Sequence, residues 1–194
     1  MKFEFATATR IIFGLGKLTE AGAQSKKCGQ HALVVTGQNV QRAEPLLKIL
    51  REAGISTVTF PVPGEPDIST VEQGTALAKK QNCDLVIGFG GGSALDTAKA
   101  IAVMLTNEGE LLDYVEIIGR GKPLAKASAP FIAIPTTAGT GSEVTRNSVL
   151  ASPEHKLKVS LRSPLMLPRV ALVDPELTYA LPPAITANTG CDAL

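Results

Sequence analysis

Short apolar runs alternate with amphipathic stretches along most of this chain of 194 residues. The apolar runs are bounded by Gly, Pro or polar residues, which predicts buried strands over residues 32–36, 57–60, 85–89, 131–134 and 170–173. Apolar positions three and four residues apart predict amphipathic helices over residues 41–53 and 95–105, and a further helix is predicted over residues 69–80. Strands that are apolar throughout and alternate with helices are typical of a parallel sheet covered on both faces. The pattern therefore predicts an α/β fold.

Two segments depart from this alternation. Residues 147–162 have no helical period and alternate loosely, which predicts a hairpin. Residues 2–13 are predicted to form an antiparallel pair or an edge strand. Pro61 is expected to end the strand over residues 57–60, because proline lacks the backbone N–H that a central strand uses.

The segment Leu181-Pro182-Pro183 marks the predicted domain boundary. Consecutive prolines continue neither a helix nor a central strand, and they stiffen a connection. We therefore expect one domain over residues 1–181. Residues 182–194 are expected to be a linker and the first helical residues of a second, truncated domain.

Composition and charge exclude several classes of function. Lys and Arg together (19) nearly balance Asp and Glu (18), so the basic excess of a nucleic-acid-binding or membrane-surface protein is missing. No run of about 18 apolar residues could span a bilayer, and the N-terminus does not resemble a signal peptide. Three separated cysteines without a CxxC motif indicate a reducing compartment. We expect a cytoplasmic protein with no nucleic-acid or membrane partner.

A glycine-rich segment, residues 90–93, follows a predicted strand and opens a predicted helix. Glycines allow a ligand to approach the backbone closely, and the free amides at a helix N-terminus favour an anion such as a pyrophosphate. The structural alternative is an ordinary tight turn in which Ser93 caps the helix. The segment matches neither GxGxxG nor a Walker loop, which makes phosphoryl transfer a weak alternative.

A second small and hydroxyl-rich segment, residues 135–143, also follows a predicted strand. Ligands of parallel sheets bind beyond the carboxyl ends of the strands, so the two segments should converge on one crevice. The structural alternative is a polar surface loop. Ser142 with Glu143 could suggest a hydrolase, but no histidine lies in a motif that would activate the serine.

Taken together and in order, the motifs of this chain resemble those of the iron-containing (group III) alcohol dehydrogenases. The resemblance covers essentially the whole chain and rests on residues 13–16 (FGLG), 90–99 (GGGSxxDxAK), 135–143 (PTTxGTGSE), 156–158 (KLK), 174–178 (DPELT) and 190–194 (GCDAL). It implies a Rossmann-like, doubly wound nucleotide-binding domain followed by an all-helical domain that holds a catalytic divalent metal. It also implies hydride transfer between an alcohol carbon and nicotinamide.

The resemblance assigns roles to individual residues. Gly92 and Ser93 are expected at the pyrophosphate, and Asp96 follows the motif but could only cap or brace its loop. Asp192 matches the aspartate that, with three histidines, holds the metal, expected to be Fe²⁺ with Zn²⁺ as the alternative. The remaining residues expected to line the nucleotide are Glu65, Thr136, Thr137, Thr145, Lys158 and Leu177.

Within that set, Lys158 and Leu177 are expected near the ribose and nicotinamide, and Glu65 on the adenosine side. Without the resemblance, Lys158 could equally be a solvated surface residue and Leu177 a core residue. His31 and His155 match no metal-ligand position and are interpreted as surface or structural residues.

Gly37 departs from the family pattern. Many members carry an acidic residue there, just after the first parallel strand, which binds the adenosine ribose. Without that carboxylate no charge repels a 2′-phosphate, so both NAD and NADP are plausible cofactors.

We therefore expect a metal-dependent, NAD(P)-linked alcohol dehydrogenase that acts on an alcohol or aldehyde and forms a homo-oligomer, a dimer. The 194 residues alone are expected to bind nucleotide without catalysing the reaction. The alternatives are a non-catalytic nucleotide-binding module or a related glycerol dehydrogenase, maleylacetate reductase or dehydroquinate synthase. The GTGSE loop favours the alcohol dehydrogenases over the last two.

Overall fold

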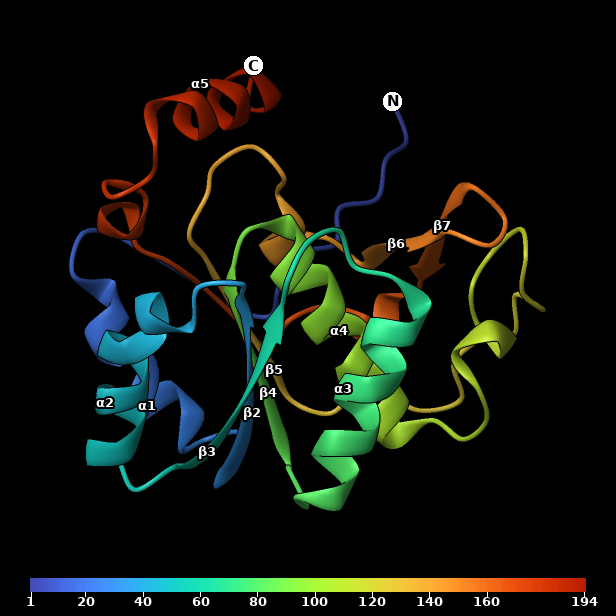
Figure 1. Ribbon diagram of the computed structural model, residues 1–194, viewed down its shortest axis with the longest axis horizontal. Coiled ribbons are helices and arrows are strands. Elements are labelled where there is room, and N and C mark those ends of the chain that lie inside the picture. Colours follow the sequence, from blue (N-terminus) through green and yellow to red (C-terminus); the bar gives the residue numbers. More distant parts are fainter.

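The computed structural model describes residues 1–194 and contains a six-stranded parallel sheet in the order β1-β8-β5-β4-β2-β3 (Figure 1). A separate antiparallel hairpin pairs β6 with β7. The strands are β1 Ile11–Phe13, β2 His31–Gly37, β3 Ser56–Val62, β4 Leu85–Gly90, β5 Phe131–Pro135, β6 Asn147–Ser152, β7 Leu157–Arg162 and β8 Val170–Val173. The predicted parallel sheet and the predicted hairpin are confirmed.

Helices cover both faces of this sheet, with α1 and α2 on one side and α3 and α4 on the other (Figure 1). The α-helices are α1 Ala21–Ser25, α2 Glu44–Glu52, α3 Ile68–Lys80, α4 Gly92–Thr106 and α5 Pro183–Asp192. Short 3-10 segments are η1 Lys17–Glu20, η2 Val40–Ala43, η3 Leu111–Asp113, η4 Ser142–Val144, η5 Pro164–Met166 and η6 Pro175–Thr178. The fold is thus the doubly wound, Rossmann-like α/β arrangement that the sequence predicts. None of its helices combines the length and the apolar character needed to cross a membrane.

Two hydrophobic cores lie on the two faces of the sheet, because successive side chains of a strand point to opposite sides. In β2, Leu33 and Val35 join the core under α3 and α4, whereas Ala32 and Val34 join the core under α1 and α2. Strands β4 and β5 alternate in the same way. This explains why each strand appears in the sequence as a continuous apolar run.

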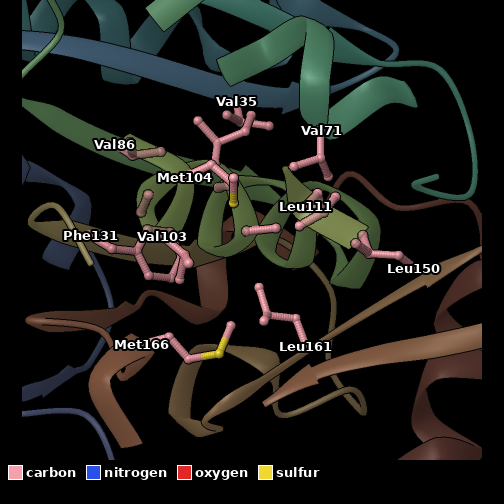
Figure 2. Close-up of a cluster of buried hydrophobic side chains, with 14 of the residues drawn as sticks. Val35, Val71, Val86, Val103, Met104, Leu111, Phe131, Leu150, Leu161 and Met166 are labelled. Carbon is pink, nitrogen blue, oxygen red and sulfur yellow. The ribbon is translucent and has the colours of Figure 1, made fainter. Parts of the chain in front are cut away.

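Helix α4 is buried almost all round, since it packs between the sheet, α3 and the hairpin. Figure 2 shows Val103 and Met104 of α4 in one cluster with Val35 of the sheet, Val71 of α3 and Leu161 of the hairpin. Helix α4, which begins within the glycine-rich segment, is therefore packed against three elements at once.

Two predictions about strands need correction. Pro61 does not end its strand, because β3 is an edge strand that continues to Val62, and an edge strand tolerates the missing N–H of proline. The predicted strand within residues 2–13 is only β1, and it pairs in parallel with β8 at the opposite edge. It is an edge strand, as one alternative proposed, and not part of an antiparallel pair.

Candidate nucleotide-binding site

The carboxyl ends of β2, β4 and β5 line one cavity of about 180 Å³. Gly37 comes from the end of β2, Gly90 and Gly91 from the end of β4, and Thr136 and Thr137 from the end of β5. Leu181, just before α5, and Ile185, in the first turn of α5, also line the cavity. Small-ligand sites usually measure roughly 300–1,000 Å³, so this cavity would enclose only part of a dinucleotide.

The two small-residue loops beside the cavity are in contact. A Cβ added to Gly91 would lie 3.1 Å from the hydroxyl oxygen of Thr137, and one added to Gly92 would lie 3.0 Å from the methyl carbon of Thr140. A side chain at either position would therefore press on the facing threonine, which would have to shift. The predicted convergence of residues 90–93 and 135–143 on one crevice is what the structure contains.

No side chain caps the N-terminus of α4. The N-cap residue is Gly91, so Ser93 does not have the capping role that the structural alternative gave it; its side chain is exposed in the first turn. The N-terminal amides of a helix that no side chain caps remain available to an anion. Glycine backbone and free helix amides fit the pyrophosphate of a dinucleotide.

Only some of the residues predicted to bind the nucleotide lie at the cavity. Gly37, Thr136 and Thr137 line the cavity, and Gly92 and Ser93 begin the adjacent helix. Thr145 does not line the cavity. Its hydroxyl donates to the carbonyl of Ser142 and lies 3.2 Å from the Lys99 ammonium.

Lys99 is hydrogen-bonded to the loop after β5. Its side chain is fully buried, and its ammonium donates to the carbonyl of Ser142 at 2.8 Å and to that of Asn147 at 2.7 Å. It also donates to the hydroxyls of Ser142 and Thr145, both at 3.2 Å. The nearby Asp96 carboxylate accepts from the Ser142 hydroxyl and, at 3.0 Å, from the amide of Val149. Asp96 therefore braces the loop.

Burial shifts the protonation of this pair. It lowers the pKa of Lys99 to about 8, although the nearby Asp96 and Glu143 carboxylates act in the opposite direction. Burial also raises the pKa of Asp96 above its ordinary value, against the effects of Lys99 and of the hydrogen bonds that the carboxylate accepts. Burial disfavours the charged form of each group, and the hydrogen bonds and the opposite charge of the partner offset part of that cost.

Glu65 and Lys158 lie together at another place, where they form an ion pair between the loop after β3 and strand β7. Both side chains stay more than half exposed. Leu177 lies in η6, where it packs against the core under α1 and α2, and its carbonyl accepts a hydrogen bond from Arg42 at 3.4 Å. Arg42 in turn lines the cavity.

Asp192 lies in the last turn of α5, beside Gly139 of the loop after β5. Its side chain is exposed, and no group of three or more His, Cys, Asp and Glu side chains that could hold a metal exists among the 194 residues. A catalytic metal needs about three protein ligands. The residues of this chain therefore do not by themselves fit a metal centre.

The sequence predicts no role for two residues of the site, Lys99 and Arg42. Lys99 follows a recognisable signal, since a lysine flanked by Ala98, Ala100 and Ile101 on an apolar helix has to be buried with partners. Arg42 has no such signal, because only the fold brings it to the cavity. Ser142 is no nucleophile: its hydroxyl is buried and bonded to Asp96 and Lys99.

The chain is similar in sequence and in fold to several known proteins. The family model described as iron-containing alcohol dehydrogenase matches residues 8–175. Choline dehydrogenase of Bacillus subtilis (strain 168) is 42% identical over 195 residues, which cover 98% of this chain and 48% of the relative. The crystal structure of a 1,3-propanediol oxidoreductase superposes with a TM-score of 0.91 at 35% identity, covering 99% of this chain and 50% of that one.

A sulfoacetaldehyde reductase from Bifidobacterium kashiwanohense, solved in complex with NAD⁺, superposes with a TM-score of 0.87 at 35% identity. The match covers 99% of this chain and 51% of that one. The chain thus spans about half the length of the relatives it matches. With the family model matched over most of its residues, the chain belongs to the iron-containing alcohol dehydrogenase family.

Proposed function

We propose that this chain supplies the NAD(P)-binding part of a metal-dependent alcohol dehydrogenase. The observation that carries the proposal is the contact between Gly91 and Gly92, at the uncapped start of α4, and the threonines of the loop after β5. Glycine backbone, free amides and hydroxyls at the carboxyl edge of a parallel sheet are the groups that a dinucleotide pyrophosphate requires.

The bound nicotinamide would accept or donate the hydride, and the residues of this chain would bind and orient the dinucleotide. The amides at the start of α4 would hold the pyrophosphate, with Ser93 able to donate from its exposed hydroxyl. Thr136 and Thr137 would contact the nucleotide from the wall of the cavity. We assign Glu65, Thr145, Lys158 and Leu177 to the wider nucleotide region by family resemblance.

The substrate class is an alcohol or an aldehyde, which the names of the similar proteins support: choline, 1,3-propanediol and sulfoacetaldehyde all carry the functional group of this reaction. Asp192 would contribute one ligand to the Fe²⁺, or Zn²⁺, of the complete site. The division at Leu181, a homodimer and a cytoplasmic location are part of the same proposal.

We propose that the site accepts NADP(H) as well as NAD(H). A Cβ added to Gly37 meets nothing within 4 Å, so the end of β2 leaves open space beside the cavity. No Asp or Glu lines the cavity, and a 2′-phosphate would meet no repelling carboxylate there.

Titration calorimetry with NADH and NADPH tests the proposal. The wild-type chain is expected to bind, and Gly92→Val is expected to lose most of the affinity, because the new side chain is forced against Thr140. Ala76→Val, on the exposed face of α3, is the matched control for added volume in a helix and should bind normally. Equal binding by Gly92→Val and the wild type would refute the site.

A further inference from the structure

The wall of the cavity carries a single charged side chain, that of Arg42. The other polar side chains there are neutral, among them Gln38 and Asn39 of the same loop. An anion beside Gly37 would therefore meet one cation and no carboxylate on this wall.

Arg42 is held close to the end of β2 by local structure. Asn39 is the N-cap of η2, and its side chain accepts from the amide of Gln41 at 3.1 Å, which fixes the turn that carries Arg42. One guanidinium nitrogen donates to the carbonyl of Leu177 at 3.4 Å. A guanidinium has five N–H groups in a planar fork, so most of them remain for a ligand.

These features favour one ligand group. A guanidinium binds phosphate oxygens through paired, charge-assisted hydrogen bonds, and an arginine near the adenosine ribose is the usual way for this kind of fold to accept a 2′-phosphate. We infer that Arg42 binds the 2′-phosphate of NADP(H) and is the residue that makes this cofactor preferred. The inference rests on the proposed function, since it needs the adenosine end of the dinucleotide beside Gly37.

Dissociation constants of NADPH and NADH for the wild type, Arg42→Ala and Arg51→Ala test the inference. Arg51 is an exposed arginine on α2 that does not line the cavity, so its removal changes the net charge equally. Loss of a charged hydrogen-bond partner should weaken NADPH binding by about tenfold or more in Arg42→Ala. NADH binding by that variant, and both affinities of Arg51→Ala, should stay within about threefold of wild type. Arg42→Lys keeps the charge without the fork and should fall between.

Adenosine 2′,5′-bisphosphate and adenosine 5′-monophosphate serve as probes of the 2′-phosphate alone. The wild type should prefer the bisphosphate, and Arg42→Ala should lose that preference. If Arg42→Ala weakens both nucleotides equally, or neither, the inference is wrong while the proposed function stands. If the wild type binds neither nucleotide, the proposed function fails and this inference with it. Circular dichroism of each variant confirms that lost binding is not lost folding.

Discussion

Gly139 lies against Asp192: a Cβ added to Gly139 would come within 2.6 Å of the Cβ of Asp192 and 2.4 Å of the carbonyl oxygen of Thr189. The loop after β5 and the last turns of α5 are therefore packed backbone to backbone. Because the same loop carries Thr136 and Thr137, the predicted metal-ligand aspartate is held next to the predicted nucleotide loop. Glycine at position 139 makes that approach possible.

Gly139→Ala should detach α5 from the loop. The substitution adds a methyl group where there is no room and also strains a backbone with φ of +92°. Gly141→Ala is the matched control, since Gly141 has φ of +60° but open space around it, so only strain is added. Hydrogen exchange of the α5 amides should be about tenfold faster or more in Gly139→Ala than in Gly141→Ala. Equal rates would show that the contact does not hold α5.

Lys99→Met should destabilise the chain by about 3–5 kcal/mol at pH 7, because it leaves the buried Asp96 carboxylate without its ion-pair partner and removes the ammonium that donates to Ser142, Thr145 and Asn147. Urea denaturation gives the free energy of unfolding. Lys48→Met, at an exposed lysine of α2, is the control and should change it by less than about 0.5 kcal/mol.

The difference in free energy of unfolding between wild type and Lys99→Met should also change with pH, in a defined direction. The pKa of Lys99 is about 8 in the folded chain and 10.5 ordinarily, so between these values the unfolded chain binds the extra proton. Stability from this group is therefore fully present above 10.5 and is lost as the pH falls through about 8. Wild type should gain stability over Lys99→Met from pH 8 to 10, by at most about 1.4 kcal/mol per pH unit. A difference that is flat or shrinks over that range would contradict the low pKa.

Gly37→Asp should shift the cofactor preference toward NAD(H). The carboxylate would repel a 2′-phosphate and could accept hydrogen bonds from the ribose hydroxyls of NAD(H). Gly37→Asn has nearly the same shape without the charge and should keep NADPH binding. Nucleotide fluorescence titrations measure both affinities. If Gly37→Asn and Gly37→Asp lose NADPH to the same extent, bulk rather than charge decides at this position.

The 194-residue chain is expected to show no alcohol dehydrogenase turnover with added ferrous or zinc ion. Asp192 is one carboxylate, and no group of three or more His, Cys, Asp and Glu side chains that could hold a metal exists among these residues. An assay with a panel of short alcohols and either dinucleotide checks this, with nucleotide binding as the control for a folded protein. Turnover that depends on metal and stops with EDTA would contradict this prediction and would mean that other side chains of the chain hold the metal.

The sequence predicts the strands well and the sheet edges poorly, for a physical reason. Residues 85–89 and 131–134 are recognisable because a strand buried on both faces has to be apolar throughout. Whether Pro61 can sit inside a strand depends on the strand's place in the sheet, which local composition does not encode. The same holds for residues 11–13, whose partner β8 lies about 160 positions away.

The candidate site divides in the same way. The glycine-rich start of α4 and the threonine loop are predictable, because both follow strand ends that a parallel sheet brings together. The contact of Arg42 with the cavity depends on η6 and on the turn at Asn39, so it emerges only from the fold. Likewise, the apolar neighbours of Lys99 in the sequence show that it is buried, but they do not show which four acceptors surround its ammonium.

The position of Lys99 has a consequence for any mutational scan of this protein. The ammonium lies outside the cavity wall, yet it fixes the carbonyls of Ser142 and Asn147, and so the course of the loop whose threonines line that wall. Variants at Lys99 and Asp96 would therefore lose cofactor affinity without removing any ligand contact. A scan ranked by affinity alone would group these two scaffold residues with the ligand contacts, and only a parallel measurement of unfolding would tell the two classes apart.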